Sequence, residues 1–557
     1  MKTDIEIARN ATPRPILEIA AAAGLLPDEV DLYGKHKAKV RQAALDRLAR
    51  RPNGRLVIVT AMTPTVAGEG KTTVTVGLGQ ALCAIGKRAV VTLREPAMGP
   101  VFGVKGGATG GGYSQVIPME DINLHFTGDF HAITAANNLL AALIDNHLQQ
   151  GNVLGIDARR ITWRRCLDVN DRALRAVITG LGGSTEGVPR ETGFDITPAS
   201  EIMAIFCLSE DLADLSQRLA RIVVGYTRAA EPVRAADLHA EGALTVLLKE
   251  ALDPNLVQTL EGGPALIHGG PFANIAHGTN SIRATRLALK LGEYALVETG
   301  FGADLGFEKF CDIVARQSGL TPDLAVIIAS ARALKLHGGA EKKDLQSENV
   351  AAVRKGLPNL LRHVENVGRF GLPALVAINT FATDTEDELQ AIEEALASQG
   401  IAAARCAIHA AGGAGGKALA ERLVALLDGD SAGEFRPLYQ DEQSLRQKIE
   451  LVATRIYRAS GVDFAGTAAK DLAQLEKLGY GRLPVCIAKT QYSFSDNAAL
   501  LNAPDDFRIT VRGARLSAGA GFVVVLTGEI MTMPGLGKAP AAERIGIDAD
   551  GNVVGLS

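Results

Sequence analysis

Short runs of apolar, mostly β-branched residues recur along this chain and are separated by longer helical stretches. Parallel strands joined by helical crossovers give such a pattern. The runs are continuously apolar rather than alternating, which fits strands covered on both faces. The sequence therefore predicts a doubly wound α/β fold with a mostly parallel sheet. The runs are Leu56–Thr60, Ala89–Leu93, Tyr294–Glu298, Leu324–Ala329, Ala374–Ile378, Val485–Ala488 and Phe522–Leu526.

The chain has 557 residues, enough for two to four domains of about 100–200 residues each. We expect three parts with approximate limits. Residues 1–360 would form the nucleotide-binding and catalytic domain, residues 361–435 a smaller middle α/β domain, and residues 436–557 a C-terminal α/β domain.

Charge and cysteine usage exclude several classes of protein. The 58 basic and 62 acidic residues give a net charge of -4, without the basic excess of nucleic-acid binders. The six cysteines are scattered and contain no C-x-x-C pair, so we expect reduced thiols rather than a zinc site or a disulfide framework. No signal pattern and no apolar run of bilayer length is present. We expect a cytoplasmic protein without nucleic-acid or membrane partners.

Histidines give no sign of a metal site held by the protein alone. His125 and His131 are six residues apart, and His268 and His277 are nine apart. Neither spacing points two imidazoles along one helix face, as i, i+4 spacing does.

A glycine-bearing loop follows the first apolar run and precedes a helical stretch. The loop reads TPTVAGEGKTT over residues 63–73. Backbone N–H groups of such a loop cradle phosphates, while Lys71 would add positive charge and the Thr72 hydroxyl would bind Mg²⁺. The usual phosphate-loop pattern has glycine where this chain has Thr65, so an ordinary strand-to-helix turn is the alternative. The position between strand and helix favours nucleotide binding and a sheet of P-loop NTPase type.

The second apolar run ends at Arg94 and Glu95. Doubly wound sheets bind ligands at the carboxyl ends of their strands, and a guanidinium suits both carboxylates and phosphates. Arg94 is therefore a candidate anion ligand, with a surface ion pair as the alternative. Five glycines follow between Gly106 and Gly112. A flexible linker and a backbone close to a ligand explain them equally well.

Taken together, several stretches resemble the formate–tetrahydrofolate ligases, or formyltetrahydrofolate synthetases, in their monofunctional form. The resemblance extends from about residue 60 to about residue 535. It rests on residues 63–73, 103–113, 120–129, 161–165, 274–278, 299–306, 332–335, 337–339 and 489–493.

The resemblance implies a reaction of ATP, formate and tetrahydrofolate that gives N10-formyltetrahydrofolate, ADP and phosphate through formyl phosphate. It also implies ATP with Mg²⁺, activation by K⁺ or NH₄⁺, folate with or without a polyglutamate tail, and a homotetramer. Such a site needs positive charge and positioning rather than a protein nucleophile.

The resemblance assigns site residues as well. Lys71 would neutralise the transferring phosphoryl group, and Arg94 would hold formate and then formyl phosphate. Asp129 would bind pterin ring nitrogens or handle the N10 proton, although a helix cap is the commoner role for such a residue. Glu95 would contact folate or serve the monovalent cation. ATP would lie over Thr65, Val66, Ala67, Gly68, Glu69, Gly70, Lys71 and Thr72.

Folate needs a flat slot, and stacking contributes about 0.5–1.5 kcal/mol per aromatic pair beyond burial. The resemblance places Tyr113, Phe301 and Phe381 at this slot. His409 stands where relatives often carry tryptophan, so we expect a weaker or pH-dependent platform, because histidine titrates near pH 6.5.

Two other functions compete with this interpretation. Another phosphate-loop ligase, similar to dethiobiotin synthetase, would activate a different carboxylate but lacks the second glycine signature. An ATP-driven switch protein would turn over ATP without formate or folate. A catalytically inactive relative is disfavoured by the intact Lys71, Thr72, Arg94 and Asp129.

Overall fold

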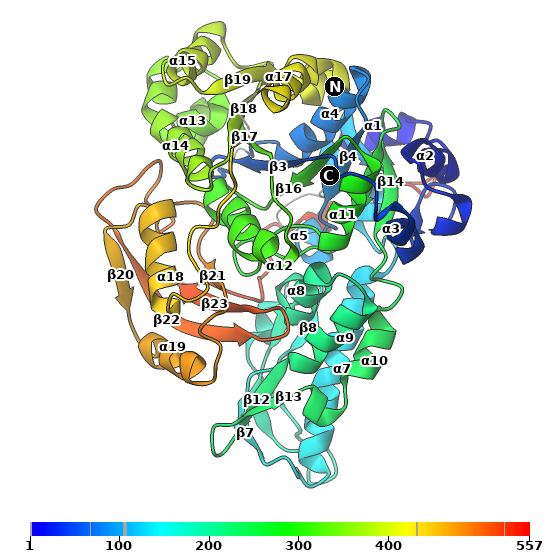
Figure 1. Cartoon of the computed structure of the whole chain (residues 1–557), viewed down its shortest axis with the longest axis vertical. Coiled ribbons are helices and arrows are strands. Elements are labelled where there is room, and N and C mark those ends of the chain that lie inside the picture. Colours follow the sequence, from blue (N-terminus) through cyan, green and yellow to red (C-terminus); the bar gives the residue numbers. More distant parts are fainter. Residues whose placement is uncertain (1–2, 67, 104–108, 430–432, 529, 557) are drawn as a thin grey trace.

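The computed structural model describes the chain except residues 1–2, 67, 104–108, 430–432, 529 and 557. A 12-stranded sheet lies at the centre of the molecule (Figure 1). Its parallel part has the order β15-β4-β16-β3-β17-β18-β19. These strands are β15 (Pro264–Ile267), β4 (Ala89–Leu93), β16 (Tyr294–Glu298), β3 (Arg55–Ala61), β17 (Leu324–Ala329), β18 (Ala374–Asn379) and β19 (Ala402–Cys406).

Both faces of the parallel strands are buried. In β3, Val57 and Val59 join one apolar cluster while Leu56 and Ile58 join another. Successive strand residues point to opposite faces, so each cluster covers one side of the sheet. The first cluster includes α4 (Lys71–Ala84) and α17 (Lys417–Asp428). The second includes α11 (Ile282–Leu291), α13 (Ala331–His337), α14 (Val350–Arg369) and α15 (Glu386–Ala397).

One side of the sheet ends in antiparallel pairing. Strand β14 pairs antiparallel with β15, β2 and β6, and β2 pairs with β1. Short helices of the N-terminal segment pack beside these strands (Figure 1). The elements are β1 (Val30–Leu32), β2 (Ala38–Val40), β5 (Gly110–Gly111), β6 (Ser114–Ile117), β14 (Asn255–Thr259), α1 (Asp4–Asn10), α2 (Ile16–Ala23) and α3 (Gln42–Leu48).

A long insertion separates β4 from β16. It carries helices and a small antiparallel sheet of order β13-β12-β7, which extend away from the main sheet (Figure 1). Its helices are α5 (Met98–Phe102), α6 (Met119–Asn123), α7 (Asp129–Gln149), α8 (Glu201–Leu208), α9 (Leu212–Arg221) and α10 (Glu241–Leu248). Its remaining strands are β7 (Ile156–Ile161), β8 (Arg165–Leu167), β9 (Val177–Thr179), β10 (Arg190–Thr192), β11 (Phe194–Ile196), β12 (Val223–Thr227) and β13 (Pro232–Arg234).

The C-terminal segment forms a separate four-stranded sheet of order β20-β22-β23-β21 beside the main sheet (Figure 1). Helices α18 and α19 accompany it, and a short hairpin, β24 with β25, follows. The elements are α18 (Leu445–Leu451), β20 (Gly461–Phe464), α19 (Ala468–Lys477), β21 (Val485–Ala488), β22 (Arg508–Ser517), β23 (Phe522–Thr527), β24 (Gly546–Ile547) and β25 (Val553–Val554).

The predicted α/β fold with a large, mostly parallel sheet is confirmed, and every predicted apolar run is a strand. The last two runs, β21 and β23, belong to the C-terminal sheet rather than the main one. Strands β18 and β19 of the middle segment pair within the main sheet. The three-part division with limits near residues 360 and 435 stays a prediction.

Candidate active site

The carboxyl ends of the parallel strands collect most of the predicted site residues. The phosphate loop follows β3, and Arg94 and Glu95 follow β4. Phe301 comes after β16, whereas Phe381 and His409 come after the neighbouring strands β18 and β19. Because all these strands are parallel, their carboxyl ends share one edge, where α/β sheets bind ligands.

The phosphate loop turns sharply into α4. Gly68 and Gly70 have φ values of 74° and 72°, which glycine adopts without a steric penalty. A Cβ on Gly70 would come within 2.6 Å of Nδ2 of Asn379, so this position also lacks space for a side chain. Lys71 is the first residue of α4, where free backbone N–H groups and the helix dipole favour anions.

Glu69 ties the loop together from inside. Its Oε1 accepts hydrogen bonds from the backbone nitrogen and from Oγ1 of Thr65, at 2.7 and 2.9 Å. Burial raises the pKa of this carboxyl. The carbonyl of Glu69 accepts a hydrogen bond of 3.0 Å from Nδ2 of Asn379 at the end of β18. Val66 and Gly68 are exposed, Thr72 is half-buried, and the predicted ATP residue Ala67 lies outside the described residues.

The loop is connected to the end of β16. Nζ of Lys71 donates a hydrogen bond of 3.1 Å to the carbonyl of Phe301. Phe301 has a positive φ of 60°, an uncommon conformation for an aromatic residue. Its neighbour Gly300 lies against Arg94, since a Cβ at this position would be 3.0 Å from Nη1 of the guanidinium. Lys71 and Arg94 therefore flank a single stretch of backbone.

Arg94 is mostly buried but only loosely held. Its Nη1 donates to the carbonyl of Pro271 at 3.2 Å, and its Nη2 lies 3.6 Å from Oε1 of Glu298. Its Nε and Oε2 of Glu298 are buried and have no hydrogen-bond partner among the residues that the structure describes. Buried polar atoms are normally hydrogen-bonded, so these two atoms are suited to a ligand.

Glu95 and Asp129 lie in a buried, charged region. Oδ1 of Asp129 accepts a hydrogen bond of 2.8 Å from Lys39, and its Oδ2 accepts one of 2.7 Å from Asn255. Burial and the nearby Asp129 raise the pKa of Glu95 well above its usual range. Within the described part of the chain, Oε2 of Glu95 has no hydrogen-bond partner. Asp129 is the first residue of α7, but the cap residue is Gly128 and no side-chain cap hydrogen bond forms there, so the helix-cap alternative is not confirmed.

The remaining aromatic candidates gather near β18 and β19. The guanidinium of Arg332 lies 4.1 Å from the centroid of the Phe381 ring. The backbone nitrogen of Tyr113 donates to the carbonyl of His409 at 2.9 Å, and Nε2 of His409 lies 3.7 Å from Oδ1 of Asp4. The Tyr113 side chain is exposed. The structure therefore joins Tyr113 to His409 and joins Phe301 to Lys71 of the phosphate loop.

Sequence reasoning missed several polar residues of this edge. Glu298 and Asn379 end apolar strands, a position that could have marked them as candidates. His277 is buried with both ring nitrogens unpartnered, and burial, aided by the charges of Lys309 and Arg94, lowers its pKa to about 3. The motif that contains His277 supported the resemblance but had no assigned role. Lys39 had no local signal at all.

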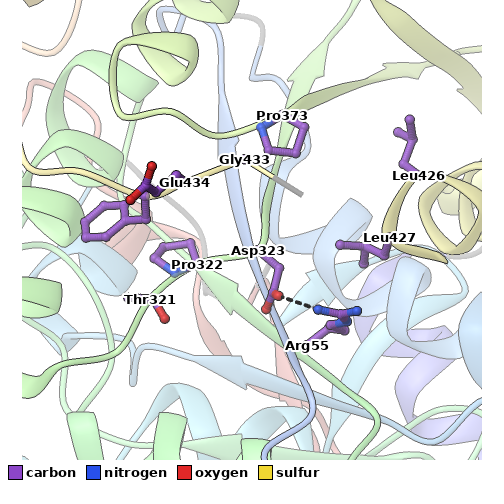
Figure 2. Close-up of a pocket in the computed structure, with 10 residues that line it drawn as sticks. Arg55, Thr321, Pro322, Asp323, Pro373, Leu426, Leu427, Gly433 and Glu434 are labelled. Atoms are coloured by element: carbon purple, nitrogen blue, oxygen red, sulfur yellow. Dashed lines mark hydrogen bonds and ion pairs between the residues drawn. The ribbon is translucent and has the colours of Figure 1, made fainter. Parts of the chain in front are cut away.

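A hollow in the surface lies elsewhere, at the amino ends of the same strands. A cavity of about 330 Å³ there is lined by Arg55, Asp323 and Pro373, together with Leu426 and Leu427 (Figure 2). Arg55 and Asp323 pair across it at 3.0 Å. None of the predicted site residues lines this cavity.

Comparison with known proteins agrees with the sequence motifs. Residues 2–557 match the family model described as formate–tetrahydrofolate ligase. A curated formate–tetrahydrofolate ligase of Symbiobacterium thermophilum is 60% identical over 557 residues, which is 100% of both chains. Within the described residues, no helix combines the length and apolar character needed to cross a membrane. The chain belongs to the formate–tetrahydrofolate ligase family.

Proposed function

We propose that this ATP-dependent ligase activates formate as formyl phosphate at the carboxyl edge of its main sheet and then transfers the formyl group to N10 of tetrahydrofolate. One observation carries the proposal. Lys71 binds the carbonyl of Phe301, and the adjacent Gly300 lies against Arg94. Lys71, a cation suited to a triphosphate, thus contacts Phe301. Arg94, a cation suited to formate, lies against the preceding residue, Gly300.

Two displacements give a balanced reaction. A formate oxygen attacks the γ-phosphorus of ATP, the bond from phosphorus to the β-γ bridging oxygen breaks, and ADP leaves. N10 then attacks the formyl carbon, the C–O bond breaks, and phosphate departs with the formate oxygen while N10 loses its proton. Both steps bring electron-rich groups together, so positive charge and alignment lower the barrier.

The loop between β3 and α4 would act as a P-loop of the NTPase type. ATP would lie over residues 65–72, with its phosphates facing the N-terminus of α4. Lys71 would neutralise the transferring γ-phosphoryl group. Mg²⁺ would arrive with ATP, and the half-buried hydroxyl of Thr72, in the first turn of α4, is the residue suited to bind it.

Arg94 would hold formate and then the phosphate of formyl phosphate. A guanidinium offers a planar fork of donors to both anions. The unpartnered Nε of Arg94 supports this role, because a bound anion would satisfy it. Glu298, which now lies 3.6 Å from Arg94, would keep the guanidinium oriented between turnovers.

Glu95 and Asp129 would serve folate and the activating cation. The ion pair of Asp129 with Lys39 supports a carboxylate that accepts hydrogen bonds from pterin ring nitrogens or takes the N10 proton. The unpartnered Oε2 of Glu95 fits a contact with folate or with K⁺ or NH₄⁺, since such hard cations prefer oxygen ligands.

The pteridine ring would stack on the aromatic side chains of this edge. Phe381 and His409 follow the neighbouring strands β18 and β19, and Phe301 follows β16 and accepts a hydrogen bond from Lys71. Tyr113 adjoins His409 through the backbone and has an exposed ring suited to the folate tail. We also propose a cytoplasmic homotetramer, the three-part domain division at residues 360 and 435, and acceptance of polyglutamylated folate.

Transfer of an oxygen label tests the pathway. With ¹⁸O-labelled formate, ATP and tetrahydrofolate, we expect one labelled oxygen per phosphate released, because the formate oxygen leaves with phosphorus. Unlabelled phosphate would rule out formyl phosphate. Rapid ADP release without formate or folate would favour the switch-protein alternative, and labelled phosphate formed with another carboxylic acid but not formate would favour a different ligase.

A further inference from the structure

The entry to the phosphate loop is held by a buried polar network that reaches into the C-terminal segment. Thr63 lies between β3 and the glycines of the loop and is completely buried. Its backbone nitrogen donates to Oδ1 of Asn359 at 3.2 Å, and its Oγ1 accepts from Nδ2 of Asn359 at 2.9 Å. Its carbonyl accepts a hydrogen bond of 3.0 Å from Nε2 of His337. Every polar atom of Thr63 is therefore engaged by α13 and α14.

The same network continues to a phenylalanine of the proposed folate slot. Oγ1 of Thr63 lies 2.9 Å from Nε2 of His363, one helical turn beyond Asn359 in α14. A Cβ on Gly302, the residue after Phe301, would come within 2.9 Å of Cε1 of His363. Burial lowers the pKa values of His337 and His363, so both rings are neutral and can accept hydrogen bonds at one nitrogen.

Asn502, in the loop after β21, bridges α14 at the point where this network begins. Its Oδ1 accepts from the backbone nitrogen of Asn359 at 3.1 Å, and its Nδ2 donates to the carbonyl of Lys355 at 2.8 Å. These two backbone groups are four residues apart and pair with each other in a regular helix. Pro358 lies inside this turn and lacks the N–H that would continue the helical ladder. The side-chain amide of Asn502 thus bridges the nitrogen of Asn359 and the carbonyl of Lys355, in place of a direct hydrogen bond between these two backbone groups.

The backbone of Asn502 is fixed by the same partners. Its nitrogen donates to Nδ1 of His337 at 3.1 Å, and its carbonyl accepts from Nδ2 of Asn359 at 2.7 Å. Its φ of 65° is a left-handed value that asparagine and glycine tolerate best. All four polar groups of Asn502 therefore form hydrogen bonds. Their partners are Asn359 and His337, which contact Thr63, and Lys355 in the preceding turn of α14.

We propose that Asn502 is a positioning residue for ATP, which sets the phosphate loop through Asn359, His337 and Thr63. The inference rests on the proposed role of that loop. Buried polar groups that make all their hydrogen bonds stay fixed, and Thr63 and Asn502 both do so, although Nδ1 of His363 has no partner among the described residues. The loop must align the γ-phosphate with formate within a fraction of an ångström. A displacement of about 1 Å at a reacting group can cost about 100-fold in rate.

The chain offers a matched control for a test of Asn502. Asn152 has a φ of 49°, and its side chain also binds two backbone groups, the nitrogen and carbonyl of Ile156, both at 2.8 Å. It lies in the insertion, at the far end of α7 from Asp129. Asn502→Gly and Asn152→Gly remove the same amide and keep the same backbone conformation, so any general loss of stability should be similar.

The two glycine variants are compared by steady-state kinetics for all three substrates. We expect Asn502→Gly to raise the KM for ATP about tenfold and to lower kcat about tenfold, with the KM values for formate and tetrahydrofolate within about twofold of those of Asn152→Gly. The proposal is wrong if the two variants have equal ATP KM and kcat values. An equal rise in all three KM values would also overturn it, because that result indicates general loosening.

A second pair of variants tests the same network at Thr63, at the entry to the phosphate loop. This test remains valid even if Asn502→Gly does not fold. Thr63→Ser keeps the hydroxyl that binds Asn359 and His363, whereas the isosteric Thr63→Val removes it. We expect the serine variant to keep the wild-type KM for ATP and the valine variant to raise it about tenfold. Equal ATP kinetics in the two variants contradict the positioning network. If Lys71→Ala is inactive in the same assay, the phosphate-loop assignment stands even when the network fails.

Discussion

The two edges of the main sheet use their polar groups in opposite ways. At the amino edge, Arg55 and Asp323 pair at 3.0 Å across an open hollow (Figure 2). The second carboxylate oxygen of Asp323 accepts from the backbone nitrogen of Leu56 at 2.7 Å. At the carboxyl edge, Nε of Arg94 and Oε2 of Glu298 are buried, and no described residue hydrogen-bonds to either atom. The charged pair that lines the amino-edge cavity is satisfied, whereas these two atoms at the carboxyl edge have no partner among the described residues.

This difference shows that, in the part of the chain that the structure describes, a cavity need not coincide with unpartnered polar atoms. Strand carboxyl ends and the N-terminus of α4 aim backbone N–H groups at one edge whatever the side chains are. Buried polar atoms without partners then mark where a ligand would compensate for lost hydration. Each of the following predictions tests whether chemistry is confined to the carboxyl edge.

The largest effect is expected from Lys71→Ala. Loss of the cation next to the transferring phosphoryl group should lower kcat at least about 1,000-fold, since each factor of ten needs only about 1.4 kcal/mol of lost transition-state stabilisation. The matched change at the amino edge, Arg55→Ala, should leave kcat within about twofold, because it removes a partly exposed ion pair worth at most about 1 kcal/mol of stability. Turnover by coupled ADP release measures both variants. Near-normal kcat in Lys71→Ala would refute the comparison.

A somewhat smaller effect is expected from Arg94→Lys. Lysine keeps the charge but loses the planar fork, so the unpartnered position of Nε stays without a donor. We expect kcat/KM for formate to fall about 100-fold, while the KM for ATP changes far less. Arg55→Lys serves as the control at the other edge. An equal loss for ATP and formate would mean that Arg94 supports the sheet edge rather than formate.

The sequence predicted those parts of the molecule that depend on near neighbours. The β3–loop–α4 unit could be predicted because apolar strand residues, glycines and Lys71 follow one another directly. Strand β19 could not, since its sequence AAARC has no β-branched residue and alanine favours helices. The sequence spacing of His125 and His131 is not the i, i+4 spacing of one helix face, yet their ring nitrogens lie 2.8 Å apart. The two rings meet because His125 lies in the turn before α7.

Long-range polar contacts were equally inaccessible from the sequence. Lys39 reaches Asp129 across 90 residues, and Asn359 reaches Asn502 across 143. Such pairs depend on how whole elements pack, and the local sequence around one residue does not predict its partner. The candidate residues were predicted from strand ends and from the family resemblance, but the partners that hold them required the structure.

The next prediction compares two aspartates. Burial raises the pKa of Asp168 to about 7. Its Oδ2 accepts a hydrogen bond from the backbone nitrogen of Met98, and its Oδ1 has no partner in the described ranges. Native Asp168 binds a proton that the unfolded chain releases near pH 4, so its contribution to stability is complete below pH 4 and falls as the pH rises to 7. Asparagine cannot ionise. We expect Asp168→Asn to gain about 2–3 kcal/mol relative to wild type between pH 5 and 8.

Guanidinium unfolding at pH 5 and pH 8 measures this gain. Asp323→Asn at the amino edge provides the control, because Asp323 has an arginine partner and both its oxygens are satisfied. It should show no gain with pH and a small loss of at most about 1 kcal/mol. A stability gap for Asp168→Asn that stays constant from pH 5 to 8 would contradict burial of an unpaired carboxyl next to the proposed folate region.

The smallest effect concerns the aromatic part of the carboxyl edge. His409 adjoins Tyr113, and its ring is about half exposed, so a larger ring can be accommodated there. His409→Trp should lower the KM for tetrahydrofolate about two- to tenfold, which corresponds to about 0.5–1.5 kcal/mol of added stacking, with the KM values for ATP and formate unchanged. His36→Trp, at a partly buried histidine of the N-terminal segment, is the control and should leave all three values unchanged. If His409→Trp leaves the folate KM unchanged or raises it, His409 does not face the pteridine, and the aromatic slot must be built from Phe301 and Phe381 alone.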